Sequence, residues 1–202
     1  MASQKDLQIE KGKTFKQVVR WETLPIVYVP ITNITKGGPA IITATAHGLV
    51  NGWRAAVSAV LGMVEINALN SPPKAKDYHI VTVVDVNTIS LNDVNSAGFT
   101  SYLSGGVLQY NTAQDMTGYT AQMSILDSVT GSVIQTLTSA AGDIVIDNTG
   151  KTITINMNQT NTGLLSWSSA LYELDMLTST ADPSNPTVTP LLYGSITAVA
   201  HL

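Results

Sequence analysis

The sequence predicts an all-β protein, and three observations support this. Short runs rich in Val, Ile and Thr recur along the 202 residues, and Gly, Asn, Asp or Pro bound them. Apolar and polar residues alternate in several of these runs, whereas the period of an amphipathic helix is nearly absent. Successive strand, turn and strand segments are spaced by about ten residues, which is typical of a sandwich or barrel.

The expected strands form two series, and the stretch between them is richer in glycine. Glycine-rich stretches near residues 36–39, 96–98 and 104–106 mark boundaries or loop tips. One helical turn is expected within residues 158–167. The first series of strands comprises residues 7–9, 14–21, 26–32, 41–44, 55–60, 77–86 and 88–91, and the second comprises 106–110, 120–126, 133–137, 143–147, 152–156, 170–178 and 191–199.

The clearest hairpin spans residues 143–156. Ile144 and Ile146 alternate with Asp143, Val145 and Asp147, and Ile153 and Ile155 follow a turn that contains Asn148 and Gly150. Both residue types tolerate the positive φ that a tight hairpin turn requires, so we expect them to supply it. A second turn is expected at residues 128–131, and a proline-broken loop at 182–186 precedes the last strand.

The composition favours a protein that packs against partners. The chain is 44% hydrophobic but only 12% charged, about half the charge content of an ordinary soluble domain, which is roughly 25%. Much of the surface must therefore consist of Thr, Ser, Asn and Gly. Such a surface gives little electrostatic repulsion between copies and has many hydrogen-bonding groups.

Charge and cysteine content exclude several functions. The net charge is −4 with ten Lys and Arg, so nucleic-acid binding is not expected. Without cysteine, neither a disulfide framework nor a cysteine metal site can form. The polar N-terminus does not resemble a signal peptide, and no apolar stretch is long enough to span a bilayer. We expect a soluble protein made in a cytoplasm.

No metal or cofactor site is expected. The three histidines, His47, His79 and His201, lie in separate segments without the short spacings of a metal motif, and cysteine cannot complete a site. His47 precedes Gly48 at the end of a strand, so a structural role in a turn is the preferred interpretation.

No catalytic residue can be assigned, and we expect that the protein is not an enzyme. Most aspartates lie at strand ends or turns, where carboxylates cap backbone amides. The serines do not form a nucleophile-elbow motif. The glycine-rich pieces at 36–38 and 104–106 lack the pattern of a phosphate-binding loop.

The aromatic residues fall into two groups. Trp21 and Tyr119 are expected to anchor the core. Trp53 follows Asn51 and Gly52 in an apparent loop, so we expect it to be exposed and available to a partner. An alternative use for exposed aromatics is stacking against a carbohydrate.

Two further segments are candidate partner contacts. The turn that contains Leu61 and Met63 is one, and the apolar end at residues 198–202 is the other, although it also fits a final strand. Trp53, Leu61 and Met63 are therefore the predicted partner contacts.

Two separated segments of the chain resemble one known phage family. Residues 6–15, Asp-Leu-Gln-Ile-Glu-Lys-Gly-Lys-Thr-Phe, are similar to the opening strand of small immunoglobulin-like proteins related to phage baseplate upper proteins. Residues 115–125, Asp-Met-Thr-Gly-Tyr-Thr-Ala-Gln-Met-Ser-Ile, resemble the segment that soon follows it in that family. Within this piece Asp115 and Thr117 can cap a turn, Gly118 frees the backbone, and Tyr119 begins a strand with its ring inward.

The simple members of that family lack the stretch between these segments. The order of residues 41–52, 62–67, 78–81, 89–91 and 104–106 resembles a small β-barrel of phage proteins, similar to the first catalytic cysteine half-domain of ubiquitin-activating enzymes. Because this chain has no cysteine, the resemblance implies the fold and no ubiquitin chemistry.

Together these resemblances imply an immunoglobulin-like β-sandwich, residues 1–25 and 110–202, with an inserted small β-barrel at 26–109. Insertion is tolerated in an exposed loop whose two ends lie close together.

The function that this interpretation implies is that of a structural virion protein of a tailed bacteriophage. The protein would belong to the tail, baseplate or fibre-attachment region and bind other virion proteins in a symmetric multi-copy assembly. Two alternatives stay open: a capsid decoration or head fibre protein, and a host-glycan-binding module that uses Trp53 and neighbouring tyrosines.

Overall fold

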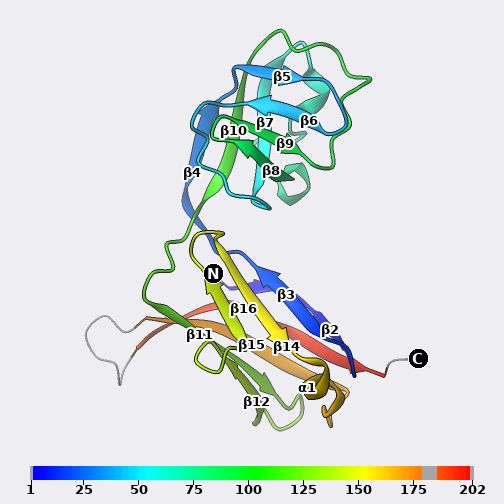
Figure 1. Ribbon diagram of the computed structural model, residues 1–202, viewed down its shortest axis with the longest axis vertical. Helices are drawn as coiled ribbons and strands as arrows, with labels where there is room; N and C mark the ends of the chain where they lie inside the picture. The colour runs from blue at the N-terminus through cyan, green and yellow to red at the C-terminus, as the bar shows by residue number, and fades with distance from the viewer. Residues whose placement is uncertain (1, 179–185, 201–202) are drawn as a thin grey trace. The chain divides into compact units, whose positions relative to one another are not determined.

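The protein has the all-β fold that its sequence predicts. A computed structural model describes residues 2–178 and 186–200 and divides the chain into two compact units (Figure 1). The sandwich unit comprises Met1–Trp21 and Asp115–Leu202, and the insert unit comprises Glu22–Gln114. The insert begins four residues before the expected start (22 against 26) and ends five residues after the expected end (114 against 109).

The sandwich unit is built from two sheets. The larger has the strand order β1-β16-β15-β11-β12, with β2 also pairing with β16, and the smaller has the order β13-β14-β3. The strands of the larger sheet are β1 (Ser3–Gln4), β2 (Leu7–Glu10), β11 (Tyr119–Leu126), β12 (Val133–Thr138), β15 (Ser169–Thr178) and β16 (Thr187–Val199). Those of the smaller sheet are β3 (Phe15–Val19), β13 (Ile144–Asp147) and β14 (Thr152–Met157).

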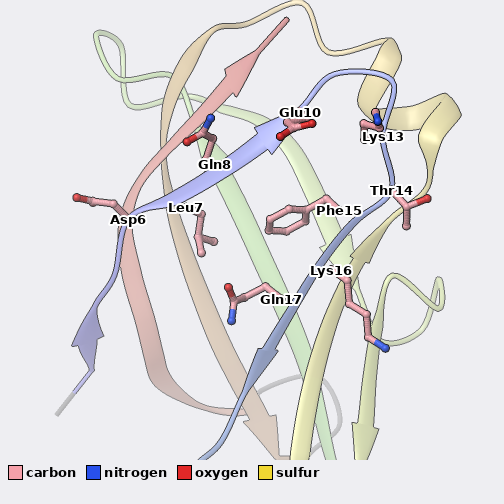
Figure 2. Close-up of a pocket in the computed structure, with 9 residues that line it drawn as sticks. All are labelled: Asp6, Leu7, Gln8, Glu10, Lys13, Thr14, Phe15, Lys16 and Gln17. Carbon is pink, nitrogen blue, oxygen red and sulfur yellow. The ribbon is translucent and has the colours of Figure 1, made fainter. Parts of the chain in front are cut away.

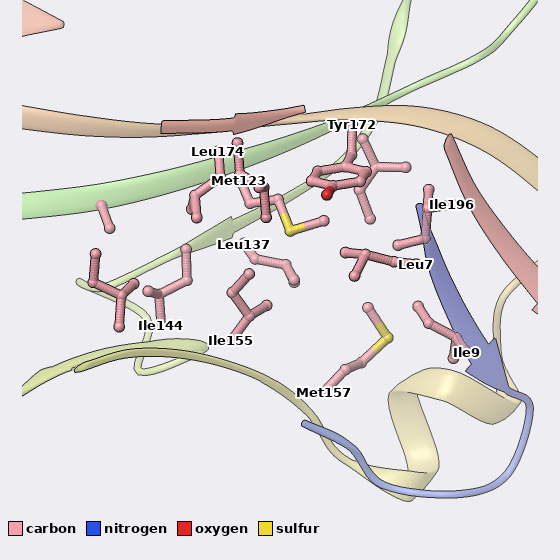
Figure 3. Packing of buried hydrophobic residues seen from close by; sticks show 14 of the residues in the cluster. Leu7, Ile9, Met123, Leu137, Ile144, Ile155, Met157, Tyr172, Leu174 and Ile196 are labelled. Carbon is pink, nitrogen blue, oxygen red and sulfur yellow. The ribbon is translucent and has the colours of Figure 1, made fainter. Parts of the chain in front are cut away.

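The core of this unit lies between its two sheets. On β15 and β14 every second residue is buried, as the alternation in the sequence predicts. Figure 3 shows Met123 and Leu174 from the larger sheet directed toward Ile144, Ile155 and Met157 from the smaller sheet and its end. The apolar surface removed from water by this interdigitation is the main source of the stability of the unit.

The strand order matches that of an immunoglobulin-type sandwich. Strands β3, β14 and β13 correspond to B, E and D, and β16, β15, β11 and β12 correspond to G, F, C and an added C′. The departure is at the N-terminus, because β1 and β2 both pair in parallel with β16. Strand A of a constant-type domain instead lies beside strand B.

The insert unit has one seven-stranded sheet in the order β4-β10-β7-β8-β9-β6-β5 around a core of its own. The edge strands β4 and β5 do not pair with each other, so the expected barrel is not closed. They are consecutive along the chain, separated by Ile31 and Thr32, and the sheet therefore curls back toward its start. Its strands are β4 (Glu22–Pro30), β5 (Asn33–Thr35), β6 (Ala40–Thr43), β7 (Arg54–Leu61), β8 (His79–Asp85), β9 (Thr88–Leu91) and β10 (Ser104–Ala113).

The hairpin expected at residues 143–156 is confirmed, with Ile144 opposite Ile155. The source of the positive φ was predicted wrongly. It occurs at Lys151 (φ 53°) rather than at Asn148 or Gly150. The Asp147 carboxylate caps the turn instead, accepting the Gly150 N–H at 2.9 Å.

The turn at 128–131 is confirmed, and the expected helical turn is α1 (Gln159–Gly163), capped by the Asn158 side chain. Residues 182–185 of the proline-broken loop lie outside the described residues. Two short 3-10 helices, η1 (Val64–Ile66) and η2 (Ala75–Asp77), complete the insert unit. Within the described residues, no helix is long and apolar enough to cross a membrane.

We predict that Tyr172→Phe lowers the free energy of unfolding by about 1–3 kcal/mol at neutral pH, because it leaves the Lys5 carbonyl without its donor. The Tyr172 hydroxyl donates to that carbonyl at 2.7 Å. Burial raises the pKa of Tyr172 from 10.0 to about 12. The neutral phenol is therefore the form that favours folding. Its contribution is complete below pH 10 and is lost as the pH rises toward 12.

Urea denaturation at a series of pH values checks this prediction. Tyr172→Phe should flatten the alkaline loss of stability relative to the wild type. An unchanged alkaline slope would contradict the role given to this hydroxyl.

Candidate functional site

Trp53 is buried, which corrects the expectation that it is exposed. Its side chain is 1% exposed within the core of the insert unit, and its indole Nε1 donates to the Asn111 carbonyl at 3.0 Å. The expected loop exists, since Gly52 has a φ of +74°. The turn is tight, however, and the chain enters β7 immediately after it, so the ring lies over the core. Trp53 is therefore a packing residue.

Met63 is also buried, whereas Leu61 is exposed as expected of a contact residue. Both flank Gly62, which has a φ of +88°. A residue with a side chain at this position would clash with the backbone of Ser101 and Leu103. The sharp turn at Gly62 sends Met63 into the core and leaves Leu61 outside.

Leu61, Val64 and Leu103 form an exposed surface that we call the aliphatic tip. Leu103 is 76% exposed, and the other two are more than half exposed. Backbone hydrogen bonds hold the tip, from the Leu103 N–H to the Leu61 carbonyl and from the Val64 N–H to the Gly62 carbonyl, both at 2.9 Å. Only Leu61 was predicted from the sequence, because Leu103 comes next to it through the pairing of β10 with β7, which joins segments far apart in the chain.

The tip residues themselves carry no charge, and the next residue, Glu65, is already engaged. Its carboxylate accepts the Thr100 N–H and hydroxyl, each at 2.9 Å. The N–H of Thr100 is the main reason that the pKa of Glu65 lies below its usual value. The tip therefore presents aliphatic surface on a backbone that is already ordered.

One ion pair ties three strands of the insert unit together. Arg54 on β7 forms a bidentate pair with Glu22 on β4, with Nε–Oε1 at 2.5 Å and Nη2–Oε2 at 2.7 Å. Asn111 on β10 donates to the same carboxylate at 2.7 Å, and the guanidinium lies 5.2 Å from the centre of the Tyr78 ring. The hydrogen bond to Glu22 raises the pKa of Arg54. These contacts indicate a structural clamp.

His47 has the structural role that its sequence position predicts. The buried ring accepts the Leu49 N–H at Nδ1 (3.0 Å), and its Nε2 lies 2.9 Å from the Asp85 carbonyl. Nδ1 is thus the acceptor and Nε2 the donor, which is the neutral form. The Tyr110 hydroxyl donates to the His47 carbonyl.

His79 is paired in a different way, with Nδ1 3.0 Å from the Asp93 carboxylate. His201 lies outside the described residues. Among the residues that the structure describes, no three His, Cys, Asp or Glu side chains gather in a way that could hold a metal ion.

The turn aspartates cap backbone amides as predicted. Asp115 accepts the Thr117 hydroxyl at 2.8 Å and its N–H at 3.1 Å, and the hydroxyl is the largest cause of its lowered pKa. Gly118 follows with a φ of +77°, and Tyr119 opens β11. The Tyr119 ring meets Trp21 edge-on at 5.2 Å, and both pack partly buried against the core.

A groove lies on the sandwich unit between β2 and β3. It encloses about 440 Å³, and Figure 2 shows Leu7 and Phe15 between the two strands, whereas Lys16 points away. Two further hollows occur, one beside Trp167 and Ile134 and one beside His79 and Phe99. The groove is lined by Asp6, Leu7, Gln8, Glu10, Lys13, Thr14, Phe15, Lys16 and Gln17.

No family model matches this chain, and no curated protein matches it either. The structure itself defines an all-β protein of two units, with an exposed aliphatic tip on the insert unit.

We predict that Trp53→Ala destabilises the insert unit by about 3–5 kcal/mol, the usual cost of emptying a large aromatic site in a core. Calorimetry of the wild type and the variant checks this prediction. A Trp53→Ala protein with unchanged thermal unfolding would show that the ring contributes little to the core.

Proposed function

We propose that the chain is a structural virion protein of a tailed bacteriophage, a component of the tail, baseplate or fibre-attachment region that binds neighbouring virion proteins. The observation that carries the binding role is the aliphatic tip. Leu61, Val64 and Leu103 are exposed on a backbone held by hydrogen bonds from Leu103 N–H to the Leu61 carbonyl and from Val64 N–H to the Gly62 carbonyl. Exposed apolar side chains on an ordered support favour association, because little conformational entropy remains to be lost.

The tip is small, so the proposal requires many copies. Full burial of one large aliphatic side chain contributes about 1.5–3 kcal/mol, and part of that is offset when two molecules lose their independent motion. Symmetric repetition makes each further contact effectively intramolecular. Weak tip contacts then produce a stable assembly.

The phage assignment rests on the resemblance of residues 6–15 and 115–125 to immunoglobulin-like baseplate proteins. The local structure agrees with what that resemblance implies. Residues 7–10 and 15–19 form strands, and the capped turn at Asp115 leads through Gly118 into β11. The strand order of the sandwich unit supports the same interpretation.

The structure leaves one of the two alternative functions open and weakens the other. A capsid decoration or head fibre protein would use the same tip, so that placement stays a second proposal. The host-glycan module was tied to Trp53 and neighbouring tyrosines, and the burial of the Trp53 ring removes the tryptophan from that platform.

Mass spectrometry of DNA-filled particles, before and after mild treatment that separates tails from heads, tests the proposal. Stoichiometric recovery in the tail fraction is the expected result. Recovery with heads would favour decoration, and absence from particles would refute a virion role.

We predict that Leu103→Asp reduces incorporation into particles, because it places a charge in the apolar contact. Val86→Asp is the matched control: this residue is 68% exposed in the same unit, in the turn between β8 and β9. Quantitative mass spectrometry of particles complemented with each variant is the measurement. Equal incorporation of the two variants would show that the aliphatic tip does not contact a neighbouring virion protein.

A further inference from the structure

The smaller sheet of the sandwich unit ends at a strand with one unpaired edge. Strand β3 pairs with β14 along Phe15–Val19, and no described strand lies on its other side. The position that strand A would occupy is vacant, because β1 and β2 pair with β16 instead. The groove between β2 and β3 runs along this edge (Figure 2). An unpaired edge presents backbone donors and acceptors to any extended strand.

The other edges of the sandwich unit are less suited to pairing. The register of β12 against β11 shifts, so that Ile134 is an extra residue, and a bulge of this kind blunts an edge. Strand β13 has four residues, one fewer than β3. Strands β1 and β2 have two and four residues. Strand β3 is the longest edge strand of this unit without a bulge.

The sequence of β3 is complementary to itself in antiparallel orientation. With Gln17 on the two-fold axis, Phe15 of one copy lies opposite Val19 of the other, and Lys16 lies opposite Val18. The first pair joins an aromatic and a β-branched residue, a favourable combination across strands. Phe15 and Val19 already pack against the core.

The outer face of the pair is also compatible. Lys16 and Val18 are exposed on that face, and Val18 is 44% exposed. The aliphatic stem of each lysine covers the valine of the partner while its ammonium group stays in water. In this register no like charges face each other directly. Gln17 lies on the other face with Phe15 and Val19, and its Nε2 donates to the Val18 carbonyl at 2.6 Å.

We propose that β3 pairs with β3 of a second copy, giving an isologous dimer in which two three-stranded sheets form one continuous six-stranded sheet. The occupant of the vacant edge is thus another molecule of this chain. The pairing uses no residue of the aliphatic tip, so it extends the proposed virion role without depending on it.

Sedimentation equilibrium of the purified full chain tests the dimer. The wild type should show the mass of a dimer at high concentration. Val18→Lys places a lysine opposite Lys16 twice per dimer, which should weaken association roughly tenfold, since like charges directly opposite are unfavourable. Val145→Lys is the matched control, because Val145 is 50% exposed on the opposite edge strand of the same sheet. It should leave the dimer intact.

A charge reversal distinguishes the pairing from a general loss of structure. The double variant Lys16→Glu with Val18→Lys puts a glutamate opposite a lysine at both positions and should restore the dimer. A wild type that stays monomeric up to its solubility limit would overturn the proposal, and so would equal weakening by Val18→Lys and Val145→Lys. Neither result depends on whether the protein is found in particles.

Discussion

The parallel pairing of the N-terminal strands with β16 is the constraint on which the sandwich unit depends. Three contacts hold this arrangement. The Tyr172 hydroxyl binds the Lys5 carbonyl, and the Asp6 carboxylate accepts the N–H and hydroxyl of Ser195 at 3.0 and 2.8 Å. Gly194 completes the set, because a Cβ there would collide with the Lys5 backbone. The N-terminal strands therefore pair with the larger sheet, and the smaller sheet has only the three strands β13, β14 and β3 among the described residues.

The pairing of its first and last strands explains how a second unit can be inserted between β3 and β11. Strands β4 and β10 pair from Glu22 and Ala113 onward, so the two chain ends of the insert lie side by side where it begins. The ion pair of Glu22 with Arg54, together with Asn111, fastens these ends to β7. The insert has its own core, and its first and last strands pair with each other. Its insertion therefore requires little change in the loop of the sandwich unit.

Most of the fold could be predicted from the sequence, since alternation and turn residues identify strands that bury one face. The strands that were not predicted, β1 and β5, have two and three residues, too few for a period to be visible. The boundaries of the insert were placed too far inside it, because the paired ends of β4 and β10 carry polar residues that do not look like a core strand. Lys151 adopted the positive φ because capping by Asp147 fixed the preceding turn.

The contact surface was harder to predict, and the reason is geometric. A turn such as that at Gly52 shows where the chain reverses but not which way the next side chain points, so Trp53 was assigned to the surface. Leu61 was identified and its neighbour Leu103 was not, because their proximity depends on the pairing of β7 with β10. Features that depend on pairing between distant segments, such as the free edge of β3, become visible only in the folded molecule.

The most direct measurement is hydrogen–deuterium exchange of the full chain at low and high protein concentration. This account predicts that amides of Phe15–Val19 facing the open edge exchange fast in dilute solution and become protected at high concentration, whereas those of Ile144–Asp147 do not change. Equal exchange of the β3 amides at both concentrations would contradict it.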